Sequence, residues 1–182
     1  SSSTLSGNSA LYGGGGIWNG GSVSISSSTL SGNSASNGGG IFNYGNGSVS
    51  ISSSTLSGNR ASYYGYGYGG SGGGIFNRGS VSISDSTLSG NSASGIGGGI
   101  YNSGSVSISS STLSSNSATQ GSGIALYDGS ITLDSSSGNV VIDDAIAKVG
   151  TSYAATLNLT TGSGTISLNA PVTSFGNTLT VS

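Results

Sequence analysis

One short string, Thr-Leu-Ser-Gly-Asn, returns along this chain at a nearly constant interval. The leucines that mark its copies are Leu5, Leu30, Leu56, Leu88 and Leu113, the last within Thr-Leu-Ser-Ser-Asn. Successive copies therefore lie 25, 26, 32 and 25 residues apart. A fixed period of about 20–50 residues is the signature of a repeat architecture, in which each unit packs only on its neighbours.

Four of the five units contain two more strings, Gly-Gly-Gly-Ile-aromatic-Asn and Ser-Val-Ser-Ile-Ser, and the fifth has the degenerate forms Leu126-Tyr127-Asp128 and Ile131-Thr132-Leu133. In the second string apolar residues alternate with serine, which is the pattern of a strand with one buried and one solvated face. Turn-forming Gly, Ser and Asn separate the strings, so each unit predicts three short strands joined by tight turns. Three strands per repeat predict an all-β fold, a parallel β-helix (β-solenoid) of about seven coils.

The repeat changes character near residue 130. Residues 1–130 hold five units of this kind, whereas residues 131–182 lose both glycine-containing strings but keep the alternation, as in the Leu-Asn-Leu of 157–159. We expect 131–182 to continue the same solenoid with a divergent repeat. Ser1 opens within a unit and Val181 lies in a strand pattern, so the expected partners are further repeats of the same chain or copies of itself stacked end to end.

An asparagine closes every copy of the first string. These residues are Asn8, Asn33, Asn59, Asn91 and Asn116. Identical Asn side chains in successive coils can pass amide hydrogen bonds along a stack, and Asn also tolerates the left-handed backbone of a sharp corner. The repeat therefore predicts a structural ladder at one turn of the solenoid.

An aromatic row follows an aliphatic row in the glycine-rich strings. We place Trp18, Phe42, Phe76, Tyr101 and Tyr127 in the aromatic row, each directly after Ile17, Ile41, Ile75, Ile100 or Leu126. Adjacent strand residues point to opposite faces, so one row should face outward, unless a bulge or corner turns both inward. An outward row would form a contact stripe for sugars or for a neighbouring fibre.

The longest unit carries a tyrosine-rich insertion. Its aromatic residues are Tyr63, Tyr64, Tyr66 and Tyr68. Insertions in solenoids project from one face, and projecting loops often carry recognition. This segment is either a contact loop or a tolerated insertion without a role.

The composition argues against several classes of function. Charged residues make up 4% of the chain, with three basic residues, five Asp and neither His nor Cys. There is no basic patch for nucleic acid, and the apolar runs are too short for a transmembrane segment. The acids are Asp85, Asp128, Asp134, Asp143 and Asp144. They form no catalytic pattern, so we expect no enzyme and no cofactor; calcium near Asp134, Asp143 and Asp144 is the one metal alternative.

The unit strings resemble those of a family of bacterial surface proteins. Gly-Gly-Gly-Ile and Leu-Ser-Gly-Asn resemble the GGA-aliphatic and F-x-x-N tetrapeptides of polymorphic outer-membrane autotransporters, with Ala replaced by Gly and Phe by Leu. GGGIYN and STLSGNSA are also similar to large secreted bacterial repeat proteins, and residues 164–172 to filamentous-haemagglutinin adhesins. These resemblances imply a right-handed β-helix displayed on, or released from, a bacterial surface.

The leading expectation is a structural repeat segment of a secreted bacterial surface adhesin or extracellular fibre, located outside the cell or on its surface. The first alternative is a carbohydrate-binding β-helix that contacts surface glycans through its aromatic row. A polysaccharide-degrading enzyme and an ice-binding protein with outward serine rows are weaker alternatives, because the acids are scattered and no regular Thr-x-Thr row is present.

Overall fold

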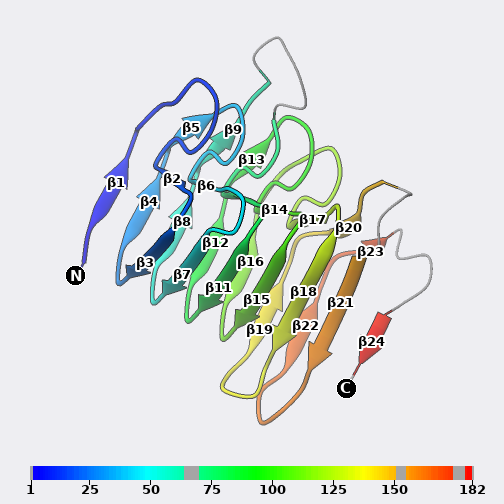
Figure 1. Ribbon diagram of the computed structural model, residues 1–182. Helices are drawn as coiled ribbons and strands as arrows, with labels where there is room; N and C mark the ends of the chain where they lie inside the picture. The colour runs from blue at the N-terminus through cyan, green and yellow to red at the C-terminus, as the bar shows by residue number, and fades with distance from the viewer. Residues whose placement is uncertain (1, 64–69, 151–154, 174–178, 182) are drawn as a thin grey trace.

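The chain folds as a right-handed parallel β-helix in which each coil passes through three sheets (Figure 1). The computed structural model describes residues 2–63, 70–150, 155–173 and 179–181. Each of the three main sheets has seven parallel strands, and β1 to β22 make six full turns. The predicted all-β class and parallel β-helix are confirmed.

The sheets are named after the strings that build them. The TLS sheet contains β1 (Thr4–Ser6), β4 (Thr29–Ser31), β8 (Thr55–Ser57), β12 (Thr87–Ser89), β16 (Thr112–Ser114), β19 (Val140–Ile142) and β22 (Ile166–Leu168). The aromatic sheet contains β2 (Ile17–Asn19), β6 (Ile41–Asn43), β10 (Ile75–Asn77), β14 (Ile100–Asn102), β17 (Ile124–Leu126), β20 (Ile146–Lys148) and β23 (Val172–Thr173). The SVSIS sheet contains β3 (Ser22–Ser26), β7 (Ser48–Ser52), β11 (Ser80–Ser84), β15 (Ser105–Ser109), β18 (Gly129–Asp134), β21 (Ala155–Thr160) and β24 (Leu179–Val181).

Three units have a fourth short strand that the three-strand pattern did not predict. These strands are β5 (Ser34–Ala35), β9 (Arg60–Ala61) and β13 (Ser92–Ala93), which pair in parallel as a small sheet of their own. They lie directly after the Asn of each unit, where a plain turn was expected. The small Ala at the second position is buried in all three, which lets the chain pass close beneath the next coil.

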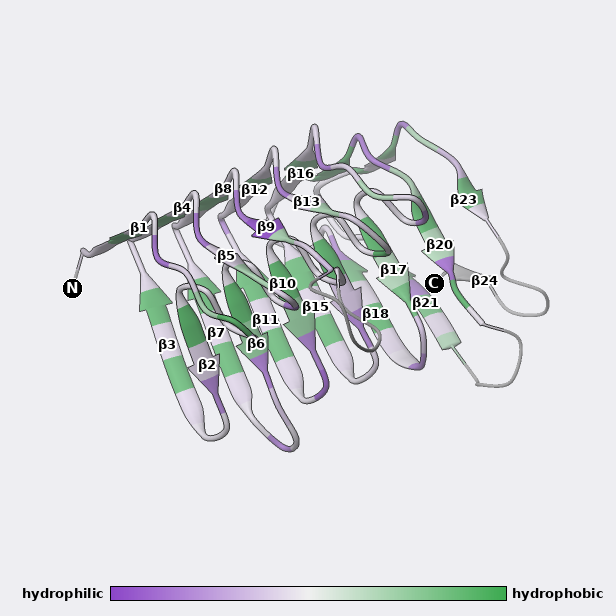
Figure 2. Ribbon diagram, turned by 90° about the horizontal axis from the view of Figure 1, so that it is seen from above, coloured by the Kyte–Doolittle hydropathy of each residue, from purple (hydrophilic) through white to green (hydrophobic). Residues whose placement is uncertain are grey.

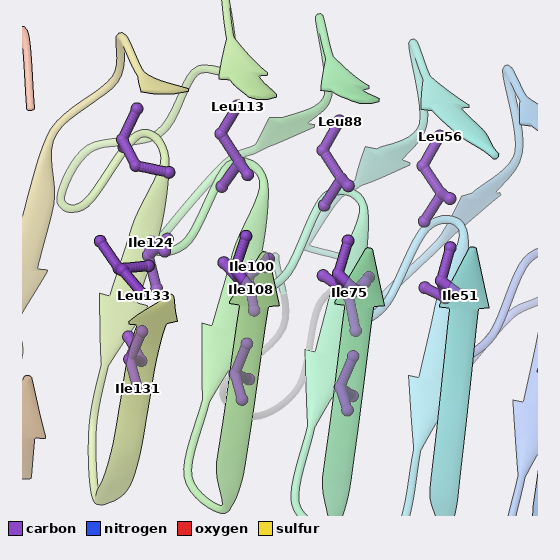
Figure 3. Packing of buried hydrophobic residues seen from close by; sticks show 14 of the residues in the cluster. Ile51, Leu56, Ile75, Leu88, Ile100, Ile108, Leu113, Ile124, Ile131 and Leu133 are labelled. Atoms are coloured by element: carbon purple, nitrogen blue, oxygen red, sulfur yellow. The ribbon is translucent and has the colours of Figure 1, made fainter. Parts of the chain in front are cut away.

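The core is made of aliphatic columns that run along the axis of the solenoid. Leu30 pairs in register with Leu56, and Ile25 with Ile51, so identical side chains stack from coil to coil. The Ile of the alternating string points inward, as its period of two predicts, and the Leu of the first string forms a second inward column: the members of both are buried, except for Leu5 in the first coil, which is half-buried. Figure 3 shows Leu56, Leu88 and Leu113 in one such column. Along the SVSIS strands, green apolar bands alternate with pale serine bands in Figure 2, as the period of two requires.

The divergent C-terminal part continues the three main sheets. Ile142 of β19 takes the register position of Leu113, and Leu157 of β21 that of Ile131. The sequence strings change there, but the inward positions stay aliphatic. Burial of the columns therefore preserves the coil although the turn residues differ.

The Gly-Gly-Gly string is required by close contact between backbones. The first glycine adopts a left-handed conformation, as at Gly72 with φ of 68°. The second lies against the neighbouring coil, so that a Cβ on Gly73 would overlap the carbonyl oxygen of Gly98 and lie 2.5 Å from that of Ser92. A side chain at this position would force two coils apart.

Replacing Gly73 by alanine is expected to lower the free energy of unfolding by about 3 kcal/mol, the upper end for overpacking, because the opposing atoms are backbone. Urea unfolding followed by circular dichroism measures the change. Gly20→Ala is the matched control, since a Cβ there has nothing within 4 Å, and it should change stability by less than about 0.5 kcal/mol. Equal stability of the two variants would contradict the backbone contact.

Candidate functional site: an aromatic groove

The aromatic row lies on the outer face of the aromatic sheet. Ile75 of β10 points into the aliphatic core, whereas Phe76 belongs to a separate apolar cluster outside it. The alternation of the strand explains this arrangement, because neighbouring residues point to opposite faces. Of the two alternatives left open by the sequence, the outward row is the one observed, but the row is partly covered: Trp18 is 59% exposed and Phe76 only 6%.

The rings of successive coils stack on one another. The ring centroids of Phe42 and Phe76 are 4.8 Å apart with an interplanar angle of 4°, and those of Phe76 and Tyr101 are 4.5 Å apart at 16°. Trp18 continues the stack at 4.9 Å from Phe42, tilted by 38°. The faces of the central rings are therefore turned toward each other, and only their edges remain for an external ligand. Sugar stacking on a ring face, the mode expected from an exposed row, is not open to Phe76.

Loops from the turn region wall the stack on one side. A Cβ on Gly13 would lie 2.8 Å from the Phe42 ring, and Ile96 packs on the same apolar cluster as Tyr101. Between loops and rings runs a groove of about 570 Å³, lined at its ends by Trp18 and Tyr127. A second, more polar hollow of about 520 Å³ adjoins it; Arg78, Tyr101 and Tyr127 line both.

Arg78 is the cation of this site. Its guanidinium carbon lies 5.4 Å from the centroid of the Phe76 ring, so the side chain packs beside the aromatic stack. The side chain is exposed, and among the residues that the structure describes no carboxylate forms an ion pair with it. Arg78 therefore lies against the aromatic stack while its donors remain available.

The fifth member of the aromatic row was predicted incorrectly. In register, Ala125 pairs with Tyr101 and Leu126 with Asn102, so Leu126-Tyr127-Asp128 is displaced by two residues from the expected alignment. Leu126 lies at the register position of Asn102, and Asp128 lies beyond the residues that pair with β14. The ring of Tyr127 nevertheless contacts that of Tyr101, at 6.1 Å and 32°, and so closes the end of the groove. The physical reason is burial: Ile124 fills the aliphatic column of β17 and Leu126 is also fully buried, so the paired strand begins two residues earlier than the aromatic string indicated.

The predicted asparagines lie in one ladder at one turn. Asn33 donates from Nδ2 to Oδ1 of Asn59 at 3.0 Å, and Asn59 donates likewise to Asn91 at 2.9 Å. The series runs from Asn8 through Asn91 to Asn116, with the four later members buried. The left-handed residue at this corner is not the Asn, as expected, but the residue before it, such as Gly58 with φ of 61°. Glycine has no Cβ penalty there, which leaves Asn free to bond along the axis.

Two further polar ladders were missed in the sequence. Asn43 donates from Nδ2 to Oδ1 of Asn77 at 2.8 Å, in a row formed by Asn19, Asn43, Asn77 and Asn102. The signal was the constant Asn after each aromatic residue. A serine ladder also runs along the axis, in which the backbone N–H of Ser54 donates to Oγ of Ser86 at 3.1 Å. The sequence did not indicate this ladder, because every unit contains many serines and most of the others face solvent.

The acids are engaged separately and do not form one site. Asp144 continues the first Asn ladder, because its Oδ2 accepts from Nδ2 of Asn116 at 2.6 Å. Asp143 accepts from Asn169, and Asp134 from the backbone N–H of Ser136. Within the described ranges no group of three or more acidic, His or Cys side chains could hold a metal ion. The three residues considered for calcium are thus not brought together.

Of the tyrosine-rich insertion, the structure describes Tyr63 alone. Its side chain is exposed, and its backbone N–H donates to Oγ of Ser94 at 3.1 Å. Tyr64, Tyr66 and Tyr68 lie outside the described residues. Within the described part of the chain there is also no helix long and apolar enough to span a membrane.

Burial in the groove raises the pKa of Tyr101 from 10.0 to about 12, against the opposing effect of Arg78. The neutral phenol is therefore favoured in the folded state. Tyr101 should contribute stability below pH 10 that is lost as the pH rises toward 12. Thermal melts across this range test the effect, with Tyr101→Phe as control: the variant should lack this part of the alkaline destabilisation. Identical alkaline profiles for both proteins would contradict a buried, neutral Tyr101.

Part of one coil of the chain is similar to a known bacterial repeat. Residues 85–103, which run from β12 past β13 into β14, match the Chlamydia polymorphic membrane protein repeat. At a coarse level, this match and the solenoid indicate a bacterial surface or outer-membrane repeat protein. No curated protein and no solved structure gives a significant match to the chain.

Proposed function

We propose that this chain is a rigid, non-catalytic structural segment of a secreted bacterial surface adhesin or extracellular fibre. The observation that carries the proposal is the unbroken register of seven parallel strands in each of three sheets. Every coil hydrogen-bonds to the coils beside it, and identical residues recur along the axis. Such a solenoid resists bending and extension, which suits a spacer that holds another part of a protein away from a cell.

The internal ladders support a mechanical role. Amide ladders tie neighbouring coils at two corners, in addition to the backbone bonds of the sheets. Because each coil contacts only its neighbours, a further coil of the same register would extend the rod through the same contacts that join the existing coils. The expected partners are therefore further repeats of the chain or other copies of it.

Single-molecule stretching of the 182-residue chain tests the mechanical role. We expect repeated force peaks whose contour-length steps correspond to one coil, about 25 residues, or to small multiples of it, because the coils unzip in sequence. A featureless extension at low force would overturn the rigid-spacer proposal.

The location and the lack of catalysis need their own tests. Antibodies against the folded chain should label intact cells of the source organism without permeabilisation. Labelling that requires permeabilisation would contradict a surface location. Incubation with a panel of polysaccharides should release no reducing ends; release that scales with protein concentration would instead favour the enzyme alternative.

A further inference from the structure

The groove beside the aromatic stack is lined by aromatic rings and by one arginine, Arg78. An aromatic ring carries a negative face and a positive edge. Because Phe42, Phe76 and Tyr101 stack face to face, their faces are occupied by one another and their edges line the groove. The arrangement therefore favours an anion over the apolar face of a neutral sugar.

Arg78 adds a full positive charge at the centre of this groove. It lines both hollows, and no described carboxylate pairs with it. A guanidinium can donate two parallel hydrogen bonds to a carboxylate or a sulfate. Tyr44, Tyr101 and Ser103 line the same polar hollow; the Ser103 hydroxyl donates to the backbone carbonyl of Asn77 and can still accept a hydrogen bond.

The shape of the groove favours a polymer. It runs parallel to the solenoid axis from Trp18 to Tyr127, across four coil-to-coil steps, which is roughly 19 Å at about 4.8 Å per coil. The wall of loops opposite the rings keeps a ligand aligned with the axis. A small ion would use only Arg78, whereas a linear chain can use the whole length.

We propose that this groove binds an anionic polysaccharide, with Arg78 contacting its acidic group and the hydroxyl-lined hollow contacting the sugar. This inference goes beyond the structural role proposed above and can fail independently of it. The half-buried Asp128 also lines the polar hollow and opposes the ligand by charge; its Oδ1 accepts from the backbone N–H of Gly129 at 2.7 Å.

Affinity electrophoresis or biolayer interferometry with the full chain tests the proposal. The probes are polygalacturonate and its methyl ester, which share a backbone and differ in charge, and dextran sulfate with neutral dextran. Arg78→Gln should weaken binding to the anionic probe about tenfold, as for loss of a charged hydrogen bond. Asp128→Asn should strengthen it about two- to fivefold.

Arg60→Gln is the matched control. Arg60 is exposed on β9, where its Nε donates to Ser62, and it lines neither hollow. The substitution removes the same charge, so unchanged binding supports a site at Arg78. Circular dichroism melts check that each variant is folded.

The outcomes separate the alternatives. Binding of polygalacturonate that depends on Arg78 assigns the acidic group as a carboxylate, and Arg78-dependent binding of dextran sulfate alone assigns it as a sulfate; both support the proposal. Equal losses of affinity for Arg78→Gln and Arg60→Gln would mean that binding depends only on the net charge of the chain. That result would overturn the proposal. Equal binding of the methyl ester, or weaker binding by Asp128→Asn, would overturn the anionic ligand in favour of a neutral sugar.

Discussion

Replacing Asn59 by alanine is expected to lower the free energy of unfolding by about 3–5 kcal/mol. Asn59 is fully buried, and its side chain serves three neighbours. Its Oδ1 accepts from the backbone N–H and the Nδ2 of Asn33, and its Nδ2 donates to Oδ1 of Asn91 and to the backbone carbonyl of Leu30. Alanine leaves the N–H of Asn33 and the carbonyl of Leu30 without these partners, at about 1–3 kcal/mol for each buried group.

Urea unfolding monitored by circular dichroism measures this loss, and a melting temperature lower by about 6–20 °C should accompany it. Asn46→Ala is the control, because Asn46 is exposed at a turn and its removal should change stability by less than about 0.5 kcal/mol. If both variants unfold at the wild-type urea concentration, the ladder is a consequence of stacking and does not stabilise it.

A second large effect is expected in the leucine column. Leu56→Ala should cost about 3–5 kcal/mol, the upper part of the range for buried leucine. Leu56 is fully buried and lies in register between Leu30 and Leu88. Because hydrogen bonds on both sides fix the spacing of the coils, the neighbours cannot close the cavity left by the missing atoms.

The same unfolding assay includes Leu56→Ile as a volume-conserving control, which should cost less than about 1.5 kcal/mol. Proteolysis of the Leu56→Ala protein should also open the chain near the third coil first, since a solenoid loses stability locally. An alanine variant as stable as the isoleucine variant would mean that the column relaxes around the gap, contrary to the fixed spacing of the coils.

The groove illustrates where prediction from sequence stops. The row of Trp18, Phe42, Phe76 and Tyr101 is visible in the sequence, but the direction of each ring is not. The ring centroids lie 4.5–4.9 Å apart because the coils are spaced at that distance. The central rings therefore turn their edges, and not their faces, toward the groove. The contribution of Tyr127, two residues beyond the expected alignment, depends on how β17 fills the core.

The repeat by itself determined the fold class, the three main strands of each coil and the inward columns, but not the fourth short strand of β5, β9 and β13. A period of two inside a unit and a constant interval between units allow one economical solution, in which like residues stack on like residues. It also indicated the first Asn ladder, because a polar residue fixed in every unit beside buried leucines must find a partner within the stack.

Only the tertiary structure decided which residues are equivalent where the strings degenerate, and what covers the outer face. Asp144 joins the Asn ladder through a hydrogen bond between coils 28 residues apart, and Leu126 replaces an Asn because its coil has to bury an aliphatic side chain there. The walls of the groove come from loops of neighbouring coils. Such contacts join residues that are distant in the sequence, so their geometry depends on the assembled stack and not on the local pattern of one unit.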